Sequence, residues 1–154
     1  MQDFVHLHVH TQYSLLDGQA SVSRLVDKAM KDGMKGIAVT DHGNMFGIKE
    51  FTNYVNKKNS GPKGEIKDLK KRIAGIESGE IECEDKEAEI ADCRAKMAEA
   101  ESKLFKPIVG CEMYVARRTM DKKEGKPDQS GYHLIVLAKN EKGYHNCLLY
   151  TSDA

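Results

Sequence analysis

The order of predicted elements in the first third of the chain limits its fold more than any other feature. An alternating stretch of β-branched, aromatic and histidine residues at 4–9 predicts a buried strand. Ser21 and Gly33 bracket a helical pattern, residues 35–40 predict a second strand, and a helical stretch then runs through Val55. This strand–helix–strand–helix order predicts an α/β fold with a parallel sheet and helices outside it.

The next part of the chain is rich in charge. Residues 56–106 contain 12 Lys and Arg and 12 Asp and Glu, half of each sign in the whole chain. Residues 56–64 combine Lys, Asn, Ser, Gly and Pro and predict a loop. Two thin apolar stripes at helical spacing follow, separated by Gly79, and predict an antiparallel αα-hairpin inserted into the α/β body. The stripes are Ile66, Leu69, Ile73 and Ile76, and Ile90, Cys93, Met97 and Leu104.

Two more strands are predicted after this insertion, at 108–115 and 132–138, with a polar loop between them and a turn or helix from 139 onward. The net formal charge is zero, so any contact with nucleic acid must be local. The longest apolar runs are far shorter than the roughly 20 residues that cross a bilayer. The first ten residues lack the pattern of a secretory signal, so we expect a cytoplasmic protein with no membrane partner.

Histidine and carboxylate residues lie near the ends of the predicted strands. His6, His8 and His10 alternate and would share one face of the first strand. Buried imidazoles need partners for both nitrogens, and His-x-His spacing suits two ligands on one ion. Such a pair alone is usually an ordinary surface or core feature. The other strands add similar residues, which favours a metal site of nitrogen and oxygen donors for Zn²⁺, Mn²⁺ or Fe²⁺. These residues are Asp17, Asp41, His42, Glu112 and His133.

Four motifs together resemble the PHP domain (polymerase and histidinol phosphatase). They are HLHVHT with YSLLDG, AVTDHGNM, IVGCE and HLIVLAKN. In this order they are most similar to the N-terminal PHP domain of bacterial replicative DNA polymerase III α subunits, over residues 3–55 and 107–146. The resemblance implies that residues 1–146 are part of a distorted (β/α)7 TIM-like barrel, with the helical hairpin at about 56–106 as an insertion. Residues 147–154 do not fit the family pattern, and we expect them to be a foreign tail.

The resemblance also implies the role of each site residue. The implied metal ligands are His8, His10, Asp17, His42, Glu112 and His133. The implied catalytic residues are Asp41, His42 and Glu112. The alternative for Asp41 is that it binds no metal and instead orients a neighbouring imidazole. His6 is expected to pack or to form hydrogen bonds, and Cys111 is expected to be core.

The implied chemistry is metal-dependent hydrolysis of phosphoesters. Intact relatives of this kind would hold roughly two or three Zn²⁺ or Mn²⁺ ions and act as a 3′–5′ proofreading exonuclease in DNA replication. Mg²⁺ would serve a polymerase part outside this chain, and the implied partners are the DNA primer 3′ end and other replisome subunits. Two alternatives remain open, a stand-alone phosphatase of the histidinol phosphate type and a non-catalytic structural module. The chain by itself, with only the early strands, is expected to be inactive.

Overall fold

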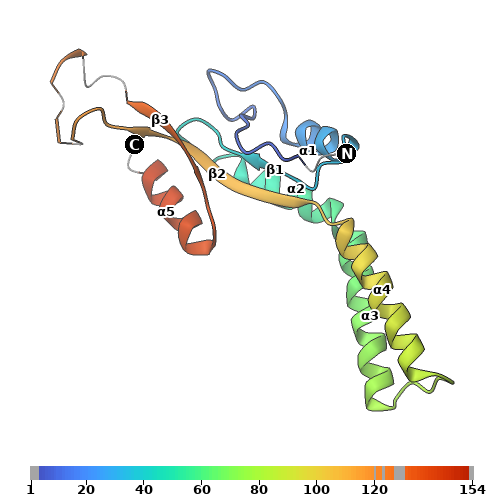
Figure 1. Cartoon of the computed structure of the whole chain (residues 1–154). Helices are drawn as coiled ribbons and strands as arrows, with labels where there is room; N and C mark the ends of the chain where they lie inside the picture. Colours follow the sequence, from blue (N-terminus) through green and yellow to red (C-terminus); the bar gives the residue numbers. More distant parts are fainter. Residues whose placement is uncertain (1–3, 120, 123, 127–130, 153–154) are drawn as a thin grey trace. The chain divides into compact units, whose positions relative to one another are not determined.

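The computed structural model describes residues 4–119, 121–122, 124–126 and 131–152. Its elements divide into two compact units (Figure 1). The first lies within Met1–Tyr54 and Lys106–Ala154, and the second is Val55–Phe105. The described part of the chain therefore has a mixed α/β fold. In the sequence, the second unit lies between the two segments of the first.

Helix α1 (Val22–Lys31) forms because apolar residues return to one face at each turn. Its buried residues are Val22, Val26 and Ala29. The helix ends where the sequence predicts, since Gly33 has a φ of 78°, a left-handed conformation that glycine adopts without steric cost. Ser21 occupies the N-cap position, but its side chain makes no capping hydrogen bond.

The described sheet has the order β1-β2-β3 and is open at both sides. Strand β1 (Gly36–Val39) is buried along its whole length and lies parallel to β2 (Lys106–Val115), with Ala38 opposite Ile108. This parallel pair confirms the α/β prediction for the second and third predicted strands. Two strands distant in the sequence thus end at the same edge of the sheet, where their polar residues can meet.

Strand β3 (Tyr132–Leu137) runs antiparallel to β2, with Tyr114 opposite His133. The prediction of a parallel sheet is therefore wrong for this strand. A parallel connection needs a crossover of a dozen or more residues, usually a helix. The described residues between β2 and β3 contain no α-helix, and the polar loop returns the chain in the opposite direction.

The predicted first strand, residues 4–9, is not a regular strand. The carbonyl of His6 accepts a hydrogen bond from the Ala38 N–H, and the carbonyl of Val9 accepts one from the Thr40 N–H, each at 2.9 Å. The Thr40 hydroxyl, however, accepts the Val9 N–H at 3.0 Å. Because a side chain replaces a backbone carbonyl there, the segment lies along β1 without forming a continuous ladder.

Two more helices contribute to the first unit. Helix α2 (Ile48–Lys58) buries Phe51 completely. Helix α5 (Glu141–Ser152) buries Cys147, and the Tyr150 hydroxyl accepts the Tyr114 N–H of β2 at 2.7 Å. Residues 147–152, part of the expected foreign tail, continue α5 without a break, and residues 153–154 lie outside the described residues.

The second unit contains α3 (Ser60–Ser78) and α4 (Lys86–Ser102), which lie side by side (Figure 1). The predicted loop at 56–64 is wrong, because α2 runs through its first residues and α3 begins at Ser60. Pro62 lies in the first turn of α3, where backbone N–H groups have no partner within the helix, so it does not break the helix.

The two helices run antiparallel. The Asn59 side chain bonds the backbone of Phe105 at 2.8 and 2.9 Å, and farther along Arg72 bonds Glu89 at 2.6 Å. Of the apolar stripes, Ile76 and Cys93 are buried and the other members are half-buried. Val55, Ala100 and Phe105 are also buried in this unit. The hairpin has its own narrow core, and its origin as an insertion stays a prediction.

We expect replacement of residues 64–102 by a Gly/Ser linker of about four residues to leave the metal content of the intact protein unchanged. Packed helices are about 8–10 Å apart, so such a linker can span the gap while it keeps Asn59 and Phe105. Metal analysis and limited proteolysis of the purified variant test this. Loss of metal, or cleavage throughout the first unit, would show that this unit needs the hairpin to fold.

Among the described residues, no helix combines the length and the apolar character that a membrane span requires.

Candidate metal centre

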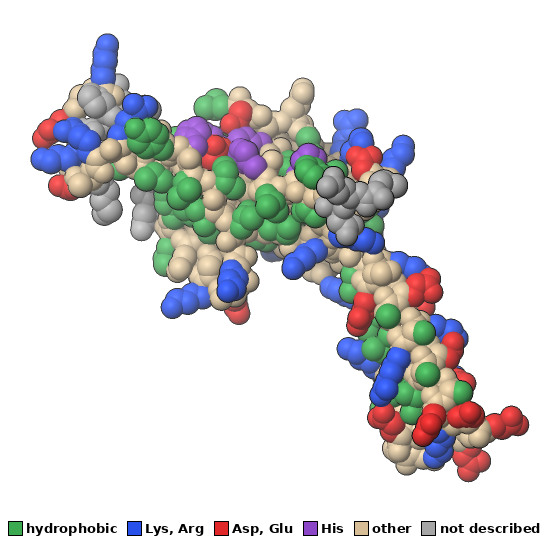
Figure 2. All heavy atoms as spheres, viewed as in Figure 1, with side chains coloured by type: hydrophobic (Ala, Val, Ile, Leu, Met, Phe, Trp, Pro, Cys, Tyr) green, Lys and Arg blue, Asp and Glu red, His purple; other side chains and the backbone are tan. Residues whose placement is uncertain are grey.

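The candidate ligands gather where the 4–10 segment, the turn after β1, and strands β2 and β3 meet. Figure 2 shows histidine side chains and carboxylates close together on one face. His42 follows β1 and forms a parallel bridge with Glu112 of β2, and β3 brings His133 to the same place. The β1–β2 pairing thus joins two of the sequence motifs, and the antiparallel return of β3 supplies the third.

Glu112 lies at the centre of the cluster, with a side chain that is only 7% exposed. Its Oε2 lies 2.7 Å from His10 Nε2 and 3.3 Å from His42 Nδ1. Its Oε1 lies 2.8 Å from His133 Nδ1. One buried carboxylate therefore contacts imidazoles from three different segments.

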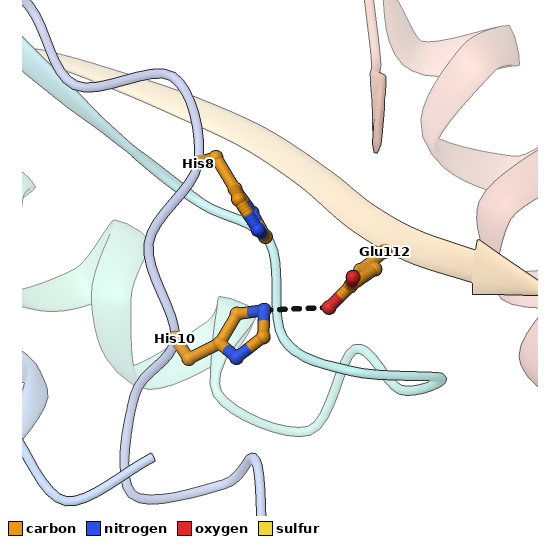
Figure 3. Close-up of side chains that lie close together, drawn as sticks. All are labelled: His8, His10 and Glu112. Carbon is orange, nitrogen blue, oxygen red and sulfur yellow. Dashed lines mark ion pairs between the residues drawn. The ribbon is translucent and has the colours of Figure 1, made fainter. Parts of the chain in front are cut away.

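Two groups of side chains offer ligand atoms that all lie within 4.8 Å of one another. The first is His8, His10 and Glu112, in which both imidazoles come from the N-terminal segment and the carboxylate from β2 (Figure 3). The second is His42, Glu112 and His133. Because Glu112 belongs to both, it is placed to bridge two ions.

The chemistry of these atoms fits divalent ions. His10 Nε2 and Glu112 Oε2 are both buried and neither makes a hydrogen bond of acceptable geometry, although they are only 2.7 Å apart. Buried polar atoms without such partners are costly, and a cation would satisfy both. Imidazole nitrogens with a carboxylate oxygen are typical ligands of Zn²⁺ and Mn²⁺.

Asp17 lies beside the two groups without belonging to either. Its carboxylate lies 3.0 Å from His10 Nδ1 and 3.4 Å from His42 Nδ1. The Ser14 hydroxyl donates to it at 2.5 Å, and this hydrogen bond, followed by the charge of the two histidines, lowers the pKa of Asp17. Ligation by Asp17 stays a prediction, and the observed contacts suit an outer partner of His10.

Asp41 is almost completely buried, and its carboxylate bonds Thr11. It accepts the Thr11 backbone N–H at 2.6 Å and the Thr11 hydroxyl at 2.9 Å. Burial raises the pKa of Asp41, and the Thr11 hydrogen bonds oppose this shift. The carboxylate thus fixes the segment that carries His8 and His10, and a catalytic role for it stays a prediction.

The backbone around His42 is positioned by short polar contacts. The His42 N–H donates to Ser14 Oγ at 3.0 Å, and the Asn44 side chain donates to the His42 carbonyl at 3.0 Å. Gly43 adopts a φ of 65° and donates its N–H to the Glu112 carbonyl at 2.9 Å. The left-handed conformation at Gly43 explains why glycine follows the histidine at this turn.

Sequence reasoning missed three residues that contact the ligands. The Thr40 hydroxyl is 2.9 Å from His8 Nδ1, Ser14 supports Asp17, and the Tyr114 hydroxyl bonds His42 Nε2. Tyr114 could have been found, because residues two apart on a strand share a face and Tyr114 is two residues from Glu112. The contacts of Thr40 and Ser14 depend on segments that meet only in the folded chain.

The remaining histidines lie outside the cluster. His6 packs edge-on against Phe4, and His145 lies 3.7 Å from Glu141 on α5. Cys111 is buried as predicted, and burial raises the pKa of its thiol to about 11.

The family model of the PHP domain matches residues 6–154. The chain belongs to the PHP domain family. The PHP match runs through the last eight residues, whose foreign origin stays a prediction.

Several curated proteins resemble this PHP chain over nearly all of its length. The DNA polymerase III subunit alpha of Treponema pallidum (strain Nichols) is 38% identical over 152 residues, and that of Borreliella burgdorferi is 39% identical over 150 residues. The subunit from Aquifex aeolicus is 31% identical over 153 residues. These alignments cover 96–98% of the chain but only 9% of each relative, so the chain spans about a tenth of their length.

Proposed function

We propose that this chain is the N-terminal portion of the PHP domain of a bacterial DNA polymerase III α subunit. In the intact protein, this domain would remove nucleotides from the 3′ end of DNA by metal-dependent hydrolysis. The single observation that carries the chemistry is Glu112, which is shared by two groups of candidate ligands. The similarity to α subunits over nearly the whole chain supports the setting in DNA replication.

The chain's own residues would divide the work at this site. His8 and His10 would hold one divalent ion with Glu112, and His42 and His133 would hold a second with the same carboxylate. Zn²⁺ or Mn²⁺, when bound, would lower the pKa of a water molecule and stabilise the charge on the leaving oxygen. Asp17 would orient His10, and Asp41 would keep the histidine segment in place through Thr11.

The proposed setting extends beyond the described sheet. The three strands would belong to a distorted (β/α)7 barrel whose other strands follow in the parent protein, with the α3–α4 hairpin as an insertion. The parent protein would act in the cytoplasm with other replisome subunits, and its polymerase part would use Mg²⁺. The proposed ligand for the exonuclease site is the primer 3′ end.

A nuclease assay on the intact protein tests the proposal. With Mn²⁺ or Zn²⁺ added, we expect single nucleotides to be released from the 3′ end of 5′-labelled single-stranded DNA. His42→Ala should lower this rate by about a hundredfold or more, because misplaced ligands misplace the reacting groups. His145→Ala, on the exposed surface of α5, is the matched control and should retain the rate. The 154-residue chain alone should be inactive.

Three outcomes would contradict the proposal. Hydrolysis that survives both chelator and His42→Ala would place the activity elsewhere in the protein. Cleavage of small phosphate monoesters without cleavage of DNA would favour a phosphatase of the histidinol phosphate type. Bound metal with no hydrolysis of either substrate would favour a structural module.

A further inference from the structure

Tyr114 lies against both histidines of the second ligand group. It stands two residues after Glu112 on β2 and directly opposite His133 on β3. Its ring centroid lies 4.8 Å from that of His42 and 5.2 Å from that of His133, with the rings close to edge-on. The hydroxyl group of Tyr114 forms a hydrogen bond with His42 Nε2. One side chain therefore contacts both imidazoles that share Glu112.

The two nitrogens of His42 face different groups. Nδ1 points to carboxylates, at 3.3 Å from Glu112 and 3.4 Å from Asp17, whereas Nε2 points to the Tyr114 hydroxyl. A neutral imidazole carries its proton on one nitrogen and a lone pair on the other. If the tyrosine oxygen accepts the Nε2–H, the lone pair is left on Nδ1, which is the nitrogen that faces Glu112.

We propose that Tyr114 is a positioning residue that directs His42 Nδ1 to a divalent ion shared with Glu112 and His133. This inference rests on the metal site of the proposed function and adds a residue to it. Metal-bound histidines commonly donate their other N–H to a fixed acceptor, which sets the tautomer and ring orientation. Here the acceptor is a phenol hydroxyl rather than a carboxylate, since both nearby carboxylates face the Nδ1 side of the ring.

The position of Tyr114 is fixed by contacts other than its hydroxyl. Its backbone N–H donates to the Tyr150 hydroxyl, and its strand register sets it against His133. Tyr114 is 49% exposed as a residue, so the fold does not depend on burial of this phenol. Tyr114→Phe should therefore keep the ring in place and remove only the hydrogen bond to His42.

Titration of the intact protein with Mn²⁺, followed by electron paramagnetic resonance, tests this role. We expect Tyr114→Phe to lower the Mn²⁺ affinity of one site by about tenfold and to leave the affinity of the site at His8 and His10 unchanged. With Co²⁺ as the probe, the visible spectrum of the weakened site should also change. Tyr132→Phe is the matched control, because it removes a hydroxyl from the same β2–β3 pair and should leave both readouts at wild-type values.

A second measurement does not depend on the variant. Anomalous diffraction from the wild-type protein with Zn²⁺ should place an ion on His42 Nδ1, with Nε2 toward Tyr114. An ion on Nε2, or Mn²⁺ affinities of Tyr114→Phe equal to those of the wild type, would overturn the role of Tyr114 alone. A wild-type protein that binds no ion would overturn the proposed metal site together with it.

Discussion

Glu112→Gln is expected to lower the affinity of the intact protein for divalent ions by more than about a hundredfold at both ligand groups. Loss of a residue that only supports a metal ligand typically lowers metal affinity 10- to 100-fold. Glu112 is itself a candidate ligand in each group, so its loss should have a larger effect. Its removal leaves each group with only two imidazoles, fewer protein ligands than zinc sites usually provide. Glutamine keeps the size of the side chain, so the loss would reflect the missing charge.

Elemental analysis after dialysis, with competition titrations for the affinity, measures this effect. Glu141→Gln is the matched control, because Glu141 is an exposed carboxylate on α5 that lies 3.7 Å from His145 and outside both ligand groups. It should retain wild-type metal content. If Glu112→Gln also retained that content, the two ligand groups would not be the metal site.

Asp41→Ala is expected to loosen the segment that carries His8 and His10 by about 3 kcal/mol. The change leaves the buried N–H and hydroxyl of Thr11 without their acceptor, and each such loss costs about 1–3 kcal/mol. Because this segment makes no continuous ladder with β1, few other backbone hydrogen bonds would compensate. Asp41→Asn keeps one oxygen acceptor and should cost about 1 kcal/mol.

Hydrogen exchange of peptides that cover residues 8–18 in the intact protein measures the loosening. Exchange should be faster by about a hundredfold in Asp41→Ala and by about fivefold in Asp41→Asn. Asp32→Ala, at the exposed end of α1, is the control and should leave these peptides unchanged. Normal exchange with lost hydrolysis in Asp41→Asn would instead favour the catalytic role implied by the family resemblance.

Much of the local structure was predictable because short-range patterns encode it. The spacing of Val22, Val26 and Ala29 predicts α1, and Gly33 predicts its end. The apolar run in β1 predicts a buried strand, and the structure buries all four of its residues. The prediction at Pro62 was wrong because the same residue that breaks a helix interior is tolerated in a first turn, and composition alone does not show which applies.

The sequence by itself determined which side chains are available for the site and which family the chain resembles. His8, His10, His42, Glu112 and His133 were all identified from motif and position, because their residue types and spacing carry the chemistry. Only the tertiary structure decided how these residues combine. The parallel β1–β2 register brings His42 to Glu112. The antiparallel pairing of β2 and β3 places Tyr114 and His133 opposite each other on adjacent strands, on the same face of the sheet. Strand direction and register depend on contacts between distant segments, so local sequence patterns do not specify them.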